Sequence, residues 1–280
     1  MKKMLGLLSL ISMLMVGITG CNTDEIKNQV GSAIEQKVEE GKEQLKDKVN
    51  SMVDDTVDGM KDTISNAANG LIADVTGALQ SVDTKDLKAA NYKRSPYVKV
   101  NNNKPYFSDE DKNRTDAFEI YSELDSLGRC GAAYANICKE LMPTAERESI
   151  SSVKPTGWNN REYDFVDGKW VYNRSHIIGF QLAGENANER NLITGTRYMN
   201  TEGMLPFENM IDDYVDETGN HVLYRVTPIF DGNNLLCEGV LMEAWSVEDD
   251  GDGICFNVFC YNVQPGIKID YSNGNNWLAE

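Results

Sequence analysis

Histidine is almost missing from this 280-residue chain, which contains only His176 and His221. The six cysteines include no CxxC pair and no Cys/His run with zinc-ligand spacing, so a structural zinc site is not expected. Positive charge is also scarce, and a formal net charge of −17 argues against a protein that coats nucleic acid by bulk attraction. The chain is nevertheless 41% hydrophobic and 9% aromatic, which excludes a wholly disordered protein.

The charge is unevenly distributed along the chain. Residues 91–207 contain 15 Lys and Arg against 16 Asp and Glu, whereas residues 208–255 contain one against 12. We therefore expect an anionic substrate to bind the middle segment and not the acidic C-terminal third.

The chain begins with a segment typical of a secretory signal. Lys2 and Lys3 precede an apolar run over 4–18, which is followed by Gly20 and Cys21. The run is too short for a transmembrane helix, and its flanking residues are typical of a signal. This ending resembles the lipobox of bacterial lipoproteins, in which the cysteine becomes the acylated first residue of the mature chain. The resemblance implies lipidation at Cys21 and an extracytoplasmic protein anchored to the bacterial cell membrane. The alternative is an ordinary cleaved signal in which the cysteine stands by chance.

Three parts are expected: a signal over 1–20, a tether over 21–90 and a folded domain over 91–280. Apolar residues recur at roughly helical spacing between Val30 and Val57, but the tether has little to bury by itself. It fits an amphipathic helix, a weak coiled coil or a flexible spacer, and we see no basis for chemistry in it. Five further cysteines remain, an odd number, and they are expected to be mostly small buried residues.

Aromatic residues begin at Tyr92 and mark the start of a core. A strand is predicted over 117–121, a helix or long strand over 130–142, and a strand over 170–172. Apolar residues at helical spacing predict a helix, with Pro206 just inside it and Gly219 just past it. Three strand-like runs follow at 221–230, 235–247 and 254–263. This order predicts an α+β fold with an antiparallel sheet and a central helix.

The segment from 173 to 208 has the residue types needed to hydrolyse a phosphodiester, since it holds five asparagines, three arginines and one histidine. A histidine with a pKa near neutrality can deprotonate water. Arginines can hold a phosphate bidentately and offset its growing charge. An asparagine carbonyl can supply one of the few protein oxygens that Mg²⁺ requires.

The run Asn173-Arg174-Ser175-His176 resembles a variant of the Asp-Arg-Gly-His motif of the DNA/RNA non-specific endonucleases, a family of the ββα-metal (His-Me finger) superfamily. Three further runs resemble its streptodornase-like branch: Gly184-Glu185-Asn186-Ala187-Asn188, Asn191-Leu192-Ile193-Thr194-Gly195-Thr196 and Met204-Leu205-Pro206-Phe207-Glu208-Asn209. The resemblance covers about 115–265 and implies a ββα-metal core that cleaves DNA, RNA or both.

The resemblance also implies roles for single residues. His176 is then the general base, and Asn200 is the direct ligand of Mg²⁺, with Mn²⁺ as an alternative. Asn191 matches a second asparagine of the active site, and Glu208 matches the acid that holds metal-bound water. A continuous helix over 200–208 would leave Asn200 and Glu208 about 80° apart, although Pro206 puts that continuity in doubt.

Two positions depart from the motif, since Asn173 replaces its aspartate and Ser175 replaces its glycine. Three arginines are candidates for binding the phosphate: Arg174 in the motif, Arg129 at an upstream strand end and Arg197 three residues before Asn200.

Other polar residues are expected to lie outside the site. His221 opens a strand without a polar cluster around it. Asp249, Asp250 and Asp252 lack the glutamate of a calcium-binding EF-hand and predict an acidic hairpin turn.

The sequence therefore predicts a membrane-tethered, divalent-metal-dependent nuclease acting on DNA, RNA or both, and it identifies no protein partner. Two alternatives stay open: a catalytically inactive lipoprotein binding module and a small-molecule phosphodiesterase on the same fold. An intact His176 and Asn200 favours an active enzyme over a relic.

Overall fold

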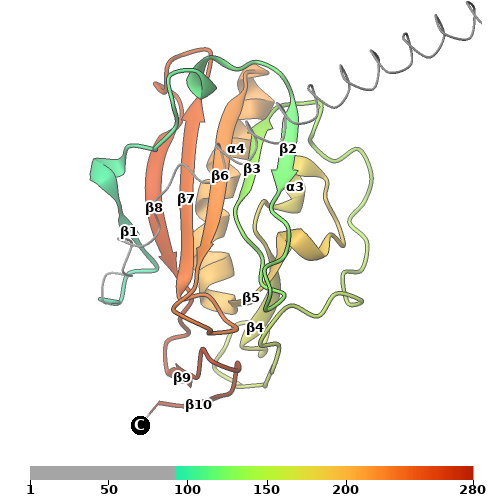
Figure 1. The fold of residues 1–280 in the computed structure, drawn as a ribbon, viewed down its shortest axis with the longest axis vertical. Coiled ribbons are helices and arrows are strands. Elements are labelled where there is room, and N and C mark those ends of the chain that lie inside the picture. Colours follow the sequence, from blue (N-terminus) through green and yellow to red (C-terminus); the bar gives the residue numbers. More distant parts are fainter. Residues whose placement is uncertain (1–91, 280) are drawn as a thin grey trace, which may run out of the picture. The chain divides into compact units, whose positions relative to one another are not determined.

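The three strand-like runs of the C-terminal third form an antiparallel meander. Strands β6 (Val222–Ile229), β7 (Gly239–Ser246) and β8 (Cys255–Tyr261) lie side by side in the computed structural model, which describes residues 92–279 (Figure 1). Almost every residue in these strands is buried, because both faces of the sheet are covered. The meander predicted from the sequence is confirmed.

Three shorter strands extend this sheet. Strand β3 (Ala133–Ile137) pairs with β6, and β2 (Phe118–Tyr121) pairs with β3. Strand β1 (Tyr97–Lys99) pairs with β8, so the order is β1-β8-β7-β6-β3-β2 with every pair antiparallel. The segment 130–142, for which a helix or a long strand was predicted, contains a strand of only five residues.

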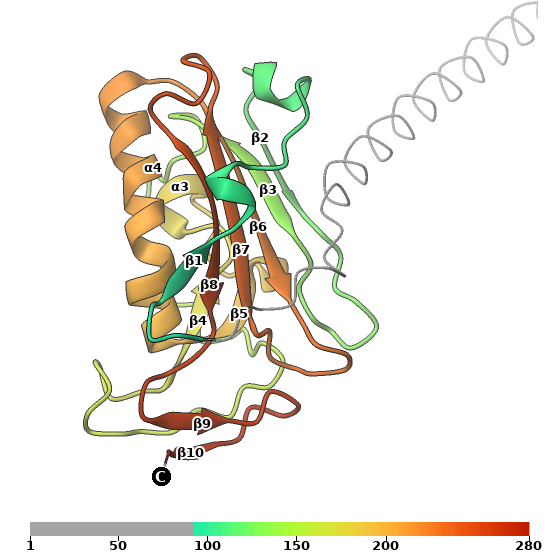
Figure 2. The same ribbon diagram turned by 90° about the vertical axis from the view of Figure 1, so that its left-hand side faces the viewer.

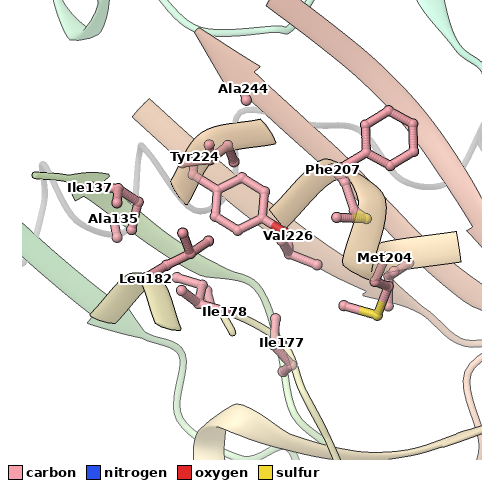
Figure 3. Close-up of a cluster of buried hydrophobic side chains, with 14 of the residues drawn as sticks. Ala135, Ile137, Ile177, Ile178, Leu182, Met204, Phe207, Tyr224, Val226 and Ala244 are labelled. Atoms are coloured by element: carbon pink, nitrogen blue, oxygen red, sulfur yellow. The ribbon is translucent and has the colours of Figure 1, made fainter. Parts of the chain in front are cut away.

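The central helix α4 (Leu205–Thr218) lies against one face of the sheet (Figure 2). It has proline in its first turn and ends where Gly219 takes a φ of 72°, as the sequence predicted. Phe207, Ile211 and Val215 on its inner face are buried together with sheet residues such as Tyr224 (Figure 3). This packing fixes the N-terminal end of α4, which forms one wall of the cavity described below.

A smaller two-stranded unit carries the predicted motif. Strand β4 (Tyr172–His176) pairs antiparallel with β5 (Leu192–Thr196), and between them lie the helix α3 (Phe180–Ala183) and the 3₁₀ turn η4 (Glu189–Asn191). A π-helical segment, η5 (Met199–Met204), follows β5 and runs directly into α4. The order β4, β5, helix is a ββα unit, and the α+β fold with its antiparallel sheet and one central helix is confirmed.

The strand predicted over 170–172 begins later than expected. Trp170 makes only an isolated bridge to Glu162, and the regular strand starts at Tyr172. The remaining short elements are η2 (Asn101–Asn103), η3 (Asp111–Asn113), β9 (Ile267–Ile269) and β10 (Asn276–Leu278).

The predicted signal, Cys21 and the predicted tether lie outside the described residues. Within 92–279 no helix combines the length and apolarity required to cross a bilayer. The five cysteines of this range are free thiols, and four of them are buried, as the sequence predicted.

Candidate active site

A cavity of about 250 Å³ opens where the end of β4, the start of α3 and the junction of η5 with α4 meet. The polar residues that line it are Arg147, Asn173, Arg174, His176, Gln181, Arg197, Asn200 and Glu208. The ββα unit therefore brings together the predicted base, the predicted metal ligand and the predicted acid. It does not bring two other predicted residues, Arg129 and Asn191, to the lining.

His176 is the last residue of β4, and only 7% of its surface is exposed. Its Nε2 lies 2.8 Å from the main-chain carbonyl oxygen of Asn186. A carbonyl can only accept, so Nε2 carries the proton in the neutral ring and Nδ1 keeps its lone pair. Burial lowers the pKa of His176, and the nearby Arg147 charge lowers it further, while the backbone carbonyls that the ring contacts oppose the shift. The imidazole is therefore neutral at neutral pH and can accept a proton at Nδ1.

Arg147 lies beside this lone pair and was not predicted from the sequence. Its Nη2 is 3.4 Å from Nδ1 of His176, and its side chain lines the cavity. The residue belongs to an irregular, exposed segment between β3 and β4, 29 positions before the histidine. The sequence around Arg147 contains no motif that would identify it as a site residue. Only its positive charge, in the charge-balanced middle segment 91–207, is consistent with binding an anion.

Glu208 is a buried carboxyl group in the first turn of α4, and 8% of its surface is exposed. Burial raises its pKa to about 7, although a hydrogen bond with the backbone of Gly179 and the Arg147 charge both act to lower it. Gly179 leaves room for this carboxyl group, because a Cβ there would lie 2.9 Å from the carboxyl carbon. The segment just after β4 is thus shaped around Glu208.

Asn200 lies in the π-helical segment η5 and lines the same cavity as Glu208. The Leu205 N–H donates to the Asn200 carbonyl, an i+5 bond that widens the turn just before α4. The chain is therefore helical from 199 to 218, and Pro206 does not interrupt it but follows directly after the wide turn. A regular α-helix would place Asn200 and Glu208 about 80° apart around its axis, as stated from the sequence. The wider turn changes this angle, yet both side chains line the cavity.

Two further arginines line the cavity in fixed positions. Arg174 donates from Nε to the Val153 carbonyl at 2.5 Å and from Nη2 to the Ser151 carbonyl at 3.2 Å. Arg197 donates from Nε and Nη2 to Asp167, at 3.0 and 2.7 Å. These bonds hold both side chains, so an anion would order them at little cost in side-chain entropy, although Asp167 offsets part of the charge of Arg197.

Arg129, a candidate for binding the phosphate, does not line this cavity. Its Nε donates to Asp125 at 2.7 Å, and its Nη1 donates to the carbonyls of Gly232 and Asn234 at 2.8 and 3.0 Å. Its guanidinium also lies over the ring of Phe230, 4.5 Å from the centroid. These contacts tie the turn after β6 to the segment before β3, a structural role.

Asn191 is fully buried and also lies outside the cavity lining. Its side chain accepts a hydrogen bond from the Ile178 N–H at 2.8 Å and donates one to the Ile178 carbonyl at 3.0 Å. Both of these bonds hold the chain two residues after His176. Asn191 therefore positions the segment that carries the histidine.

The serine that replaces the motif's glycine is accommodated without entering the cavity. Ser175 is fully buried, and a Cβ on Gly195 would lie 2.3 Å from its Oγ. Gly195 thus provides the space for this side chain. Asn173, the replacement for the motif's aspartate, does line the cavity.

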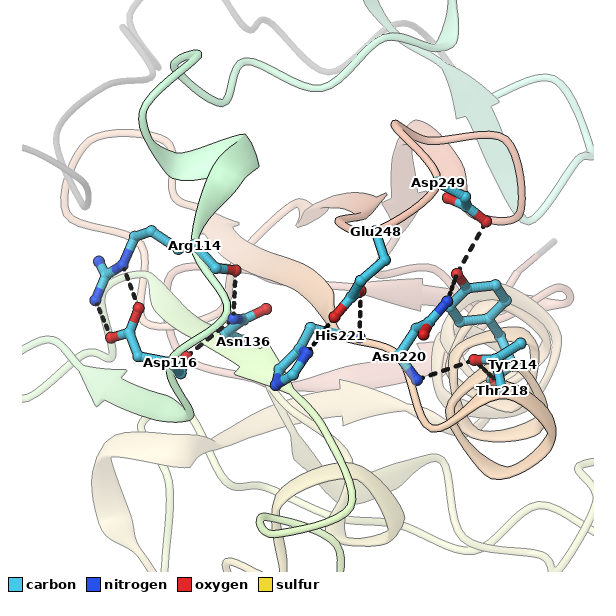
Figure 4. A network of polar contacts seen from close by, with 9 residues as sticks. All are labelled: Arg114, Asp116, Asn136, Tyr214, Thr218, Asn220, His221, Glu248 and Asp249. Carbon is cyan, nitrogen blue, oxygen red and sulfur yellow. Dashed lines mark hydrogen bonds and ion pairs between the residues drawn. The ribbon is translucent and has the colours of Figure 1, made fainter.

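His221 and the acidic turn take no part in this cavity. The Nδ1 of His221 lies 2.5 Å from Glu248, which also accepts from its backbone N–H (Figure 4). Asp249 accepts from the Tyr214 hydroxyl at 2.9 Å and from the Gly253 N–H at 3.0 Å, so it closes the turn between β7 and β8.

The donor set of the cavity suits a hard, hydrated cation. Among residues 92–279 no group of three or more His, Cys, Asp or Glu side chains converges as a metal site. The cavity offers an amide at Asn200 and a carboxyl group at Glu208, which are oxygen donors. Few protein oxygens and a large share of water are typical of Mg²⁺ and unlike a structural zinc site.

The family model for DNA/RNA non-specific endonucleases matches residues 88–248, more than half of the chain. The chain belongs to the DNA/RNA non-specific endonuclease family, and the resemblance found in the sequence is confirmed.

Solved nucleases share this fold. NucA from Streptococcus agalactiae with magnesium bound aligns over 70% of this chain and 94% of its own, with a TM-score of 0.60 and 21% identity. The Sda1 nuclease with bound zinc aligns over 66% of this chain and 97% of its own, with a TM-score of 0.58 and 26% identity.

Proposed function

We propose that this protein is a divalent-metal-dependent endonuclease that hydrolyses phosphodiester bonds of DNA, RNA or both, with His176 as general base. One observation carries the proposal. The ring of His176 is held by a main-chain carbonyl so that its Nδ1 lone pair adjoins a cavity lined with arginines, Asn200 and Glu208. A base, anion-binding groups and oxygen donors for a cation are the parts that phosphodiester hydrolysis requires.

His176 takes the proton from the attacking water at Nδ1. Its lowered pKa keeps the ring neutral at neutral pH, so Nδ1 is free to accept a proton. As the ring becomes positively charged, the Asn186 carbonyl on Nε2 stabilises it, because a hydrogen bond from a charged donor is stronger. The carbonyl therefore fixes both the tautomer and the orientation of the base.

Arg147, Arg174 and Arg197 bind the scissile phosphate and offset the charge that develops on its oxygens. Arg174 is already held by carbonyl partners and offers a fixed positive charge to an anion, while Arg197 shares its charge with Asp167. Arg147 is exposed and adjoins Nδ1, where a bound phosphate would draw it away from the base.

Asn200 would hold the cation directly, and Glu208 would hold it through water. When bound, the cation supplies positive charge that stabilises the leaving oxygen. Burial raises the pKa of Glu208 to about 7, and a cation bound beside it would favour its ionised form. NucA was solved with magnesium and Sda1 with zinc. We propose Mg²⁺ for this chain because Asn200 and Glu208 are oxygen donors.

We also propose that Cys21 is the lipidated first residue of an extracytoplasmic protein, and that residues 21–90 tether the nuclease domain to the membrane. The basic start, the short apolar run and the small residues before the cysteine support this. Metabolic labelling with a fatty acid tests it. Labelling of the wild type that is no greater than that of Cys21→Ser would contradict the proposal.

Incubation of the full-length protein with plasmid DNA, RNA and a small phosphodiester, with Mg²⁺ and with EDTA, separates the functions. The proposal predicts cleavage of a polymer in Mg²⁺ and none in EDTA. Cleavage of the small diester alone identifies a small-molecule phosphodiesterase. Polymer binding without cleavage in any divalent metal identifies an inactive binding module.

A further inference from the structure

A groove of about 500 Å³ adjoins the proposed catalytic cavity and shares Arg147, Asn173 and Arg174 with it. Its aromatic lining comes from Trp158, Trp170 and Tyr172. The groove and the cavity thus form a continuous surface in which flat apolar groups lie next to positive charge. The cavity chemistry proposed above makes no use of these aromatic rings.

Trp170 is the unexplained member of this groove. Its side chain is 47% exposed, and it belongs to none of the hydrophobic clusters of residues 92–279. The preceding turn places it there, since Gly168 and Lys169 both have positive φ values, of 68° and 67°. A large ring in such a position contributes little to the core, and an aromatic side chain exposed in a groove beside a site is typical of ligand binding.

Trp158 differs from Trp170 because it is half-buried against a hydrophobic cluster. It packs against the cluster formed by Val171, Tyr172, Leu236 and Ile267, and the Arg174 guanidinium lies 4.3 Å from its ring centroid. Trp158 thereby supports Arg174, and Trp170 is the ring that remains available to a ligand.

The charge of the groove selects an anionic ligand. Its described lining includes Arg147 and Arg174 and no acidic residue, in a chain with a net charge of −17. A ligand with a flat apolar part and an adjoining negative charge can contact both the aromatic rings and the arginines of the groove. A nucleotide within a polynucleotide has this combination.

We propose that this groove binds an unpaired nucleobase of the substrate, which stacks on Trp170, while the adjoining phosphate is the scissile phosphate already assigned to Arg147 and Arg174. The inference rests on the proposed nuclease function and deepens it. Trp170 lies six positions before His176 along the chain, a span of at most about 20 Å, so the stacked base lies close to the bond that is cleaved. A base in an intact duplex is covered on both faces by its neighbours, so the groove favours single-stranded substrate.

Two measurements on the full-length protein test this proposal. The first is binding of a fluorescent oligothymidylate in EDTA to His176→Ala, with and without Trp170→Ala, Trp170→Phe or Trp277→Ala. Trp277 is the matched control, since it is 48% exposed on β10 and does not line the groove. We expect Trp170→Ala to weaken binding about 5- to 150-fold, as loss of one base-stacking contact does. Trp170→Phe should retain most of the affinity, and Trp277→Ala should bind like its parent.

The second measurement compares kcat/KM on a single-stranded oligonucleotide and on a hairpin duplex, in an otherwise wild-type chain. Trp170→Ala should lower the single-strand value at least 5-fold and leave the duplex value within 2-fold, which fits a loss of stacking alone. Equal losses on both substrates, or a variant that binds and cleaves like Trp277→Ala, would overturn the base-stacking subsite. Failure of the wild type to cleave any nucleic acid would instead refute the proposed function, and the EDTA binding series would still report on the groove.

Discussion

Replacing Glu208 with glutamine should remove a distinct pH dependence from the stability of the metal-free protein. Burial raises the pKa of this carboxyl group from 4.5 to about 7 in the folded chain. Below pH 4.5 the group is protonated in both the folded and the unfolded state, so its contribution to the free energy of unfolding is constant. Between pH 4.5 and 7 the unfolded state releases the proton while the folded state retains it, and the folded state loses stability. A shift of this size corresponds to about 3 kcal/mol, lost in full once the pH passes the folded pKa.

Urea denaturation in EDTA at several pH values between 4 and 8 measures this effect. The stability of the wild type minus that of Glu208→Gln should fall by about 3 kcal/mol over the window, because most other titrating groups cancel in the difference. Saturating Mg²⁺ should flatten the decline, because a nearby cation favours the ionised carboxylate. Parallel curves for the two proteins in EDTA would refute the reasoning that burial keeps Glu208 protonated.

The remaining predictions concern the cavity walls. Gly179→Ala should displace the Glu208 carboxyl group, because the new Cβ would lie 2.9 Å from the carboxyl carbon. This variant should lower kcat at least 10-fold and lose about 1–3 kcal/mol of stability. An unchanged kcat in a folded variant would contradict this placement of Glu208. Asn200→Ala should shift the Mg²⁺ concentration for half-maximal activity upward by at least 10-fold, and a metal titration that overlays the wild type would exclude Asn200 as a ligand. Arg147→Ala should reduce kcat/KM at least 10-fold without altering the melting temperature. Arg129→Ala should instead lower the melting temperature, because it loses its hydrogen bonds to two carbonyls, and should leave kcat/KM within 2-fold. The opposite pattern for these two arginines would restore Arg129 as the phosphate-binding residue.

The main elements of the fold could be predicted because local signals and tertiary structure agree. Pro206 and Gly219 bracket α4, and the apolar runs of the last third give the three strands of the meander. The segment 130–142 was ambiguous, because a short apolar run fits a strand and a helix equally well. At 170–172 the positive φ of Lys169 delays the regular strand, and sequence periodicity does not report a backbone turn of this kind.

The part of the site that could be predicted lies on one continuous stretch of chain. His176, Arg174, Asn200 and Glu208 all belong to the ββα unit, so a local motif string identifies them together. Arg147 reaches the base from an irregular segment, and that contact depends on how the chain folds back.

Two contacts in the structure could not be predicted from the residue types in the sequence. The partner of His176 Nε2 is a main-chain carbonyl, which any residue at position 186 would supply. The strand-end position of Arg129 does not reveal that Asp125 and two carbonyls hold its side chain outside the cavity lining.

Plasmid nicking by His176→Ala in Mg²⁺ tests whether His176 is the general base. We predict a loss of at least 100-fold relative to the wild type, about the usual contribution of a general base, in a variant with an unchanged circular dichroism spectrum. Added imidazole should restore part of this activity by accepting the proton that the missing side chain would take, and His221→Ala should nick plasmid at the wild-type rate. A folded His176→Ala variant that retains wild-type activity would contradict the assignment of His176 as the base.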